Sequence, residues 1–246
     1  MDISGEIELV GQNVKLFKKG DQVYGTAGGR LGANAEYISL PERSAIVKKP
    51  SNINHHQAAS IIFGGMTAIY FLRDQLNIRK GQDVLVNGAS GSTGTVLIQL
   101  AVYFGATVTA VCSSVNVELV TKLGAKKVID YTKEGLTTDN KTYDVILDAV
   151  GNLSLPQCKK VMNKQGKLVL LNTDLLTNLL SLFRKSVICG VAAENKERLN
   201  FLRNCIESGH ITPIIDKIYP LKNTADAHRY VDTGSKKGNV VIAVTH

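Results

Sequence analysis

The sequence predicts an α/β protein in which helices cover both faces of a parallel β-sheet, with a smaller β-rich domain beside it. From Gly81 onward, short continuous apolar runs alternate with helix-like runs over more than a hundred residues, as in parallel sheets that are buried on both faces. The two ends of the chain instead carry short strand-like runs separated by glycine turns. We therefore expect one domain over residues 53–211 and a second over 1–52 and 212–246.

The expected elements follow in chain order. The N-terminal strands are predicted in "GEIELVG", "GDQVYG" and "AEYISLP". Ser51 or Asn52 is expected to cap a helix, and residues 66–76 have helical apolar spacing. The central strands are predicted in "DVLVN", "TVTAV", "KKVIDY", "YDVILDAV", "GKLVLL" and "SVICGV". Helices are predicted over 94–104, in "NVELVTKLG" and over 196–206, and a last helix near 225–231 lies between the strand-like runs "ITPIIDKIYPL" and "NVVIAV".

Composition indicates a globular protein with a bias toward anionic ligands. The chain has 44% hydrophobic and 20% charged residues, and its net charge of +8 comes from 29 Lys and Arg against 21 Asp and Glu. The basic residues occur as scattered pairs rather than as one block, which disfavours nucleic acid as a partner. No apolar run approaches the roughly 20 residues of a membrane span, and no secretory signal is evident. We expect a cytoplasmic protein without membrane partners.

The four cysteines, Cys112, Cys158, Cys189 and Cys205, lie far apart and lack the paired spacing of metal ligands. Cys112 and Cys189 lie in apolar runs, so we expect both to be buried. Widely separated single cysteines of this kind suit a reducing compartment.

The stretch "VNGASGSTGTVLIQLA" places Gly88, Gly91 and Gly94 between a strand and a helix. A dinucleotide site needs such a turn, because its backbone must approach the pyrophosphate while the amides at the helix N-terminus face the anion. Gly91 is expected where a side chain would collide with phosphate, and Gly94 is expected to let the helix sit close on the sheet. A tight turn without a ligand is the alternative, but the strand–helix–strand context favours a Rossmann-type cofactor domain.

The second strand of this domain favours NADPH over NADH. An NAD site places Asp or Glu about 20 residues after the first glycine, where the acid binds the ribose 2′-hydroxyl. That region reads "VCSSVN", and no acid occurs from Thr107 to Val117. Ser113 and Asn116 are small hydrogen-bond donors there, and Lys122 and Lys133 are expected nearby. Ser113 and Ser114 also suit a helix cap, a role compatible with phosphate binding.

Six stretches in order resemble the zinc-independent, zeta-crystallin-like quinone oxidoreductases of the medium-chain dehydrogenase/reductase superfamily. These stretches are "GDQVYG", "GMTAIYFL", "GQDVLVNGASGSTGTVLIQLA", "VTAVCSSVNVELVTKLGAKKVIDYTKE", "YDVILDAVGN" and "AHRYVDTGSKKGNVVI". Ser92 departs from the family, which usually has a second consecutive glycine at this position.

The resemblance implies a Rossmann domain, a GroES-like catalytic domain, and hydride transfer from NADPH to a quinone or an α,β-unsaturated carbonyl. It places the cofactor against residues from several loops. Those at the pyrophosphate are Ser90, Gly91, Ser92, Thr93 and Gly94, and those at the 2′-phosphate are Ser113, Asn116 and Tyr131. Thr67 is implied near the nicotinamide, Val150, Gly151, Leu171 and Asn172 at strand ends beside the cofactor, and Lys237 and Gly238 in a C-terminal segment that approaches it.

The resemblance also implies that two features are absent. "IIFGGM" stands where zinc enzymes of the superfamily have a catalytic cysteine, and "TAGGRLGANAEY" replaces their cysteine-rich lobe, so no zinc is expected. His55 and His56 are expected to diverge on a helix as exposed residues. Family members have a substantial stretch before the equivalent of "MDISGEIELVGQ". The GroES-like domain is therefore expected to be incomplete, and it could be open or completed by a partner, with a homodimer possible.

The sequence identifies no general acid. Tyr24, Tyr37 and Tyr70 are candidates by chemistry, with core packing as the alternative role.

Three further functional classes stay open at this point. The chain could instead bind NADPH without turnover, as a sensor or partner module. A zinc-type alcohol dehydrogenase is the enzymatic alternative, and nucleic-acid binding rests on net charge alone.

Overall fold

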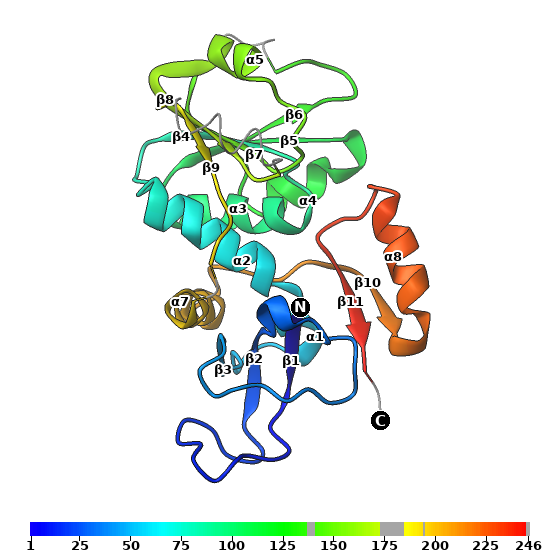
Figure 1. Ribbon diagram of the computed structural model, residues 1–246. Coiled ribbons are helices and arrows are strands. Elements are labelled where there is room, and N and C mark those ends of the chain that lie inside the picture. Colours follow the sequence, from blue (N-terminus) through cyan, green and yellow to red (C-terminus); the bar gives the residue numbers. More distant parts are fainter. Residues whose placement is uncertain (137–140, 173–184, 194, 245–246) are drawn as a thin grey trace. The chain divides into compact units, whose positions relative to one another are not determined.

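The computed structural model describes residues 1–136, 141–172, 185–193 and 195–244 (Figure 1). The chain forms two compact units: a terminal unit of Met1–Met66 with Ala193–His246, and a central unit of Thr67–Ala192. Residues 53–66 and 193–211, which the sequence placed with the central domain, thus group with the chain ends. One reason is that Leu202 packs so closely on Gly65 that a Cβ at Gly65 would lie 2.5 Å from the leucine Cδ2.

The central unit contains a six-stranded parallel sheet with the strand order β6-β5-β4-β7-β8-β9. The strands are β4 (Asp83–Asn87), β5 (Thr107–Cys112), β6 (Lys127–Asp130), β7 (Tyr143–Asp148), β8 (Met162–Leu170) and β9 (Val187–Cys189). This arrangement confirms the predicted Rossmann-type sheet. Strand order runs outward in both directions from β4, so the topology switches between β4 and β7, where open α/β sheets bind ligands at their carboxyl edge.

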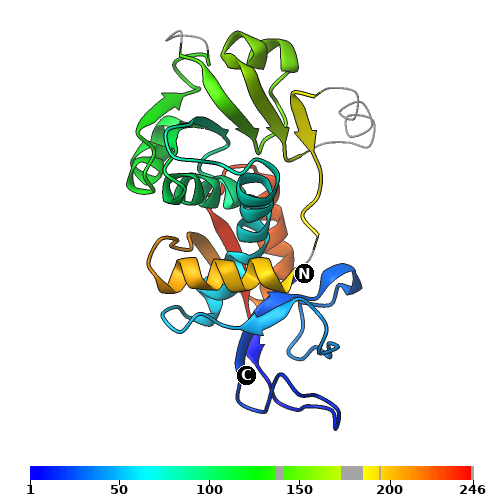
Figure 2. The ribbon, with the colours of Figure 1, turned by 90° about the vertical axis from the view of Figure 1, so that its left-hand side faces the viewer.

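The central region also contains several helices. They are α2 (Ile62–Ile69), which crosses into the terminal unit at its N-terminal end, the π-helical η2 (Tyr70–Gln75), α3 (Ser92–Tyr103), η3 (Ser114–Asn116), α4 (Val117–Lys122) and α5 (Leu155–Lys160). Figures 1 and 2 show α3 and α4 on one face of the sheet, where α3 contacts β4 and β5 and α4 contacts β5 and β6. α5 packs against β8.

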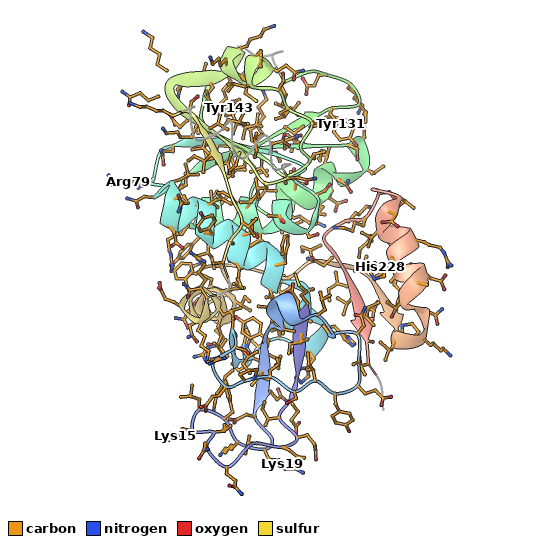
Figure 3. The ribbon with its side chains drawn as sticks, viewed as in Figure 1. Lys15, Lys19, Arg79, Tyr131, Tyr143 and His228 are labelled. Carbon is orange, nitrogen blue, oxygen red and sulfur yellow. The ribbon has the colours of Figure 1, made fainter. Side chains whose placement is uncertain are left out.

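A continuous apolar core supports the strands of the central sheet. Leu85, Val111, Ile146 and Leu168, one from each of four strands, are each no more than 3% exposed and belong to the same cluster. Tyr143, labelled in Figure 3, is fully buried in this cluster. The continuous apolar runs of the sequence therefore reflect strands whose two faces are both covered.

The terminal unit contains two small sheets. One is antiparallel and built from β1 (Asp2–Glu6), β2 (Gln22–Thr26) and β3 (Ile46–Lys48); the other is a parallel pair of β10 (Ile215–Pro220) and β11 (Asn239–Ala243). Its other elements are η1 (Gly28–Arg30), α1 (His55–Ser60), α7 (Lys196–Glu207), η4 (Leu221–Asn223) and α8 (Thr224–Asp232). α1 contacts strands of both sheets, and α8 lies along β10 and β11 (Figure 1).

Two predictions for the terminal unit were wrong. "AEYISLP" forms no strand: Tyr37 is 67% exposed, and the third strand is built instead from the buried Ile46 and Val47. The first helix is capped by Asn54 rather than by Ser51 or Asn52, through a capping box with Gln57. No helix in the described ranges is both long and apolar enough to cross a membrane.

His55 and His56 are partly buried rather than exposed. Ser4 donates its hydroxyl hydrogen to the carbonyl of Val23 at 3.0 Å, so its oxygen accepts from His55 Nδ1 at 2.8 Å. His55 therefore protonates at Nε2. Burial, aided by the charge of Lys49, lowers the pKa of His55 below its ordinary value.

We predict that His55 makes the terminal unit less stable in mild acid. Its lowered folded-state pKa means that, between that pKa and the ordinary value of about 6.5, the unfolded chain binds more protons than the folded chain. The free energy of unfolding is therefore fully retained above this window and falls as pH falls through it. Urea unfolding of wild type and His55→Gln across this range measures the effect. The variant should have the shallower pH dependence, and equal slopes would contradict the assignment.

Candidate cofactor-binding site

The glycine-rich turn after β4 is organised as an anion-binding turn. Gly88 has a positive φ of 75°, which favours glycine, and the amide of Ala89 donates to the carbonyl of Val111 on β5 at 3.1 Å. Gly91 is the extended N-cap residue of α3, and no side chain within the described ranges caps this helix. The first turn of α3 therefore presents backbone amides at the carboxyl edge of the sheet, where they can bind an anion.

Gly91 and Gly94 are glycines for different reasons. A Cβ at Gly94 would lie 2.1 Å from the carbonyl oxygen of Gly88, so only glycine lets α3 approach the turn this closely. The sequence predicted close packing at Gly94, and the partner is the turn backbone. A Cβ at Gly91 would meet that same oxygen at an ordinary 3.4 Å. Packing within the protein therefore does not require glycine at position 91.

Asn116 connects the glycine turn to the end of β5. Its side chain donates from Nδ2 to Ser90 Oγ at 3.0 Å and to Ser113 Oγ at 3.2 Å. The residue is only 7% exposed, and Oδ1 is buried without a hydrogen-bond partner in the described part of the chain. An acceptor left in this state costs free energy unless a ligand satisfies it.

Asp130 joins the ends of β5 and β6. Its carboxylate accepts hydrogen bonds from the hydroxyls of Ser114 and Thr132, and Lys133 Nζ lies 3.2 Å away. These hydrogen bonds, the one from Ser114 first, hold the pKa of Asp130 far below its ordinary range. Tyr131, which follows Asp130, is 64% exposed (Figure 3). Ser113 and Tyr131 thus directly follow the neighbouring strands β5 and β6. This proximity is needed if both residues are to contact the same phosphate group.

A second polar cluster lies where the topology switches. The fully buried carboxylate of Asp148, at the end of β7, accepts from Asn87 Nδ2 at 2.8 Å and from the amides of Val150 at 3.0 Å and Gly151 at 2.9 Å. The amide of Leu153 donates to its other oxygen at 2.9 Å. Asp148 therefore shapes the whole turn after β7 and fastens that turn to the end of β4.

Sequence reasoning missed Asn87 and Asp148. The available signal was a single polar residue that ends an otherwise apolar run, in "DVLVN" and in "YDVILDAV". The predicted residues of the neighbouring loops do gather around this cluster. The amide of Leu171 donates to the carbonyl of Asp148 at 3.0 Å, and Asn172 Nδ2 lies 3.5 Å from the carbonyl of Val150. The ends of β7 and β8 therefore form one continuous edge.

Three predicted residues are not placed at this edge by the described contacts. Thr67 is buried on α2, and Lys237 and Gly238 belong to the terminal unit. The backbone amide of Lys237 donates to Asp216 at 3.0 Å, and Gly238 has a positive φ of 56° in a turn where a Cβ would lie 2.4 Å from a carbonyl oxygen. Their approach to a cofactor stays a prediction. Lys122, expected near the 2′-phosphate, pairs with Glu118 at 2.6 Å.

The candidate reactive side chains are mostly engaged in structure. Tyr24 is buried and donates to the carbonyl of Leu199 at 2.6 Å, and burial raises its pKa. Tyr70 packs edge-on against Phe71.

The described cysteines are poor candidates for catalysis. Burial raises the pKa of the Cys112 and Cys158 thiols to about 11, so neither is a ready nucleophile. Cys189 is only partly buried, unlike the prediction. Among the described residues, no three or more His, Cys, Asp or Glu side chains gather as metal ligands would.

Comparison with known proteins places the chain among oxidoreductases. Residues 123–242 match the family model described as zinc-binding dehydrogenase. The chain is 34% identical over 98% of its length to the chloroplastic NADPH-dependent alkenal/one oxidoreductase of Arabidopsis thaliana, and it spans 62% of that protein's length. It is 32% identical over 99% of its length to the mitochondrial NAD(P)H oxidoreductase RTN4IP1 of Bos taurus, of which it spans 69%.

A solved structure supports the same conclusion. The Escherichia coli quinone oxidoreductase, crystallised with NADPH, superposes with a TM-score of 0.80 at 25% identity. The match covers 98% of this chain and 81% of the other.

We predict that Asp148 is a major stabiliser of the central unit. In the wild type, the Asp148 carboxylate accepts from backbone amides, and in Asp148→Asn an NH₂ group faces some of these donors instead. The substitution should therefore lower the free energy of unfolding by about 2–3 kcal/mol. Asp144→Asn is the matched control, because Asp144 lies at the other end of β7, is less buried and accepts from one amide and one side chain. Urea denaturation followed by circular dichroism measures both variants. An equal or smaller loss in Asp148→Asn would contradict this assignment.

Proposed function

We propose that this chain, which belongs to the quinone oxidoreductase family of the medium-chain dehydrogenase/reductase superfamily, binds NADPH at the carboxyl edge of its six-stranded sheet and reduces a quinone or an α,β-unsaturated carbonyl. The observation that carries the proposal is the turn from Gly88 to Gly94. It presents helix amides that no described side chain caps, at the topological switch point, and the protein's own packing would accommodate a Cβ at Gly91.

The residues of this edge fit the two phosphate-bearing parts of the cofactor. The amides at the start of α3 suit the pyrophosphate, because their partial positive charge faces the sheet edge. The hydroxyls of Ser90 and Ser113 each accept from Asn116, which leaves their own hydrogens to donate to an anion. Tyr131 is exposed beside them, where it suits the adenosine end.

The edge formed by β7 and β8 suits the nicotinamide end. Asp148 fixes the turn that carries Val150, a 47% exposed apolar side chain, so this turn can pack against a ring without losing its shape. When bound, NADPH supplies a hydride to the substrate. The chain's own contribution there is to hold the ring in place and to exclude water from one side of it. The names of the relatives, alkenal/one and quinone oxidoreductases, support the substrate class.

The direct test is reductase activity of the purified chain. NADPH absorbance should fall when a para-quinone or a short enone is added. A saturated ketone of the same size is the control for substrate selectivity, and with it the NADPH absorbance should stay constant. Tight NADPH binding without turnover of any quinone or enone would sink the reductase proposal and favour a binding module.

We predict that Gly91→Ala weakens NADPH binding with only a small loss of stability, which comes from alanine being a poorer N-cap residue than glycine. The new methyl group is accommodated by the protein, yet it occupies the space proposed for the pyrophosphate, so the Kd should rise about tenfold or more. Gly94→Ala is the contrasting variant. It forces α3 away from the turn and should destabilise the fold by about 1–3 kcal/mol. Thermal unfolding and NADPH fluorescence titration measure both effects, and an unchanged Kd for Gly91→Ala would contradict the site.

A further inference from the structure

The amino edge of the central sheet, where its strands begin, gathers the positive charge of the chain. All six strands are parallel, so the segments that lead into them lie at one edge although they are far apart in sequence. The segments of the amino edge hold ten of the 29 Lys and Arg but only two of the 21 Asp and Glu, so the rest of the chain has 19 of each. The net charge of +8 is therefore located at this edge. The segments are residues 79–83, 104–107, 126–127, 141–144, 159–167 and 185–187.

Backbone contacts hold these segments side by side. The amide of Lys126 donates to the carbonyl of Val108 at 2.9 Å, which ties the start of β6 to β5. Lys159 and Lys160 form the last turn of α5, directly before β8. Residues 163–166 bulge from the ladder between β7 and β8, near the first residues of both strands. The pairs of lysines that the sequence shows as scattered are thus brought together by the parallel topology.

Most of these cations face solvent and have no acidic partner. The two acids of the amino edge are engaged within it, because Asp83 pairs with Lys141 at 2.7 Å and Asp144 accepts from Asn163 at 2.6 Å. Like charges held close together repel one another, and a bound anionic surface relieves that repulsion. Seven cations are exposed and form no ion pair with any described residue: Arg79, Lys80, Lys126, Lys159, Lys160, Lys164 and Lys185.

The extent and composition of this row indicate the kind of partner. Neighbouring strands lie about 4.8 Å apart, so six strands spread the charge over about 24 Å, which is too long for one small anion. Nine of the ten cations are lysine. Nucleic-acid recognition favours the planar fork of arginine, and protein–protein interfaces are depleted in lysine. An anionic lipid surface attracts lysine and arginine alike through their charge, so this composition favours a bilayer.

Two exposed side chains add a second feature of membrane-facing surfaces. Val102 and Tyr103 lie at the end of α3, directly before residues 104–107 of the amino edge, and they are 40% and 42% exposed. A tyrosine ring, with an apolar body and a polar tip, suits the depth of the lipid headgroups. Figure 3 shows Arg79 of the amino edge and Tyr131 of the carboxyl edge at opposite sides of the central unit.

We propose that the amino edge is a peripheral membrane-binding surface that recognises anionic lipid headgroups. Such binding needs no apolar span, whereas the expectation of no membrane partner rested on the lack of one. The proposed cofactor site lies at the opposite edge of the sheet, so a lipid-bound chain keeps that site free. The inference stands apart from the proposed function, because it requires neither NADPH nor turnover.

Vesicle sedimentation tests this surface. The probes are vesicles of phosphatidylcholine with about 30% phosphatidylserine, and vesicles of phosphatidylcholine alone. The wild-type chain should bind the phosphatidylserine vesicles at low salt and leave them as salt is raised above physiological ionic strength, since counter-ions screen the attraction. Its partition coefficient on phosphatidylcholine alone should be lower by about tenfold or more.

A triple variant identifies the edge, and circular dichroism checks that it folds. Lys159→Gln, Lys160→Gln and Lys164→Gln together remove three cations of the amino edge and keep long polar side chains there. The partition coefficient on phosphatidylserine vesicles should fall by about tenfold or more.

A matched control changes the net charge equally with three exposed lysines of the terminal unit. It combines Lys15→Gln, Lys18→Gln and Lys222→Gln, and its partition coefficient should stay within about twofold of wild type. An equal loss in both variants would overturn the assignment to this edge. Equal binding of the two kinds of vesicle, or binding of neither, would overturn the membrane surface itself.

A nucleic acid is the competing occupant, and a single-stranded RNA oligonucleotide tests it by fluorescence anisotropy. The proposal predicts that any RNA binding is lost at or below the salt concentration that releases the vesicles. RNA that stays bound above that concentration, and is lost in the amino-edge variant but not in the control, would assign this edge to nucleic acid instead.

Discussion

The buried carboxylate of Asp148 holds the ends of β4 and β7 together at the point where the strand order reverses. Parallel strands give regular backbone pairing along their length, but at their carboxyl ends the chain must leave the sheet in separate loops. Asp148 fixes the conformation of the loop after β7 and joins it to the end of β4, because its carboxylate accepts from three amides of that loop and from the side chain of Asn87. The shape of the whole carboxyl edge follows from that constraint.

Two further side chains continue this arrangement across the sheet. Asn116 connects the turn after β4 to the turn after β5 through Ser90 and Ser113, and Asp130 connects the turn after β5 to the end of β6 through Ser114. Three side chains, those of Asp148, Asn116 and Asp130, therefore bridge four adjacent strand ends in the order β7, β4, β5 and β6. Loops joined in this way keep a fixed spacing, which an elongated ligand needs if it is to contact several of them at once.

The sequence predicted the parts of the structure that local pattern determines. Each of the six central strands was found because its apolar run is continuous, and the glycine turn was found because helix and strand flank it. Residues 35–41 were wrongly predicted as a strand, since a short run with Tyr37 and Ile38 has strand character but pairs with no strand in the part of the chain that the structure describes. The predicted domain boundary differs from the boundary between the two compact units. The amphipathic pattern of α7 indicates that one of its faces is buried, but it does not indicate that the face packs in the terminal unit. Asn87 and Asp148 were missed because they lie 61 residues apart and meet only through strand order.

The central claim is that one ligand contacts the loops after β4, β5 and β7 together, and hydrogen–deuterium exchange with and without NADPH tests it most directly. The account predicts slower exchange of the amides in three separate segments, residues 88–94, 113–116 and 149–151, with the N-terminal turn of α3 protected most. Protection confined to a single segment, or located only on loops at the opposite edge of the sheet, would contradict it.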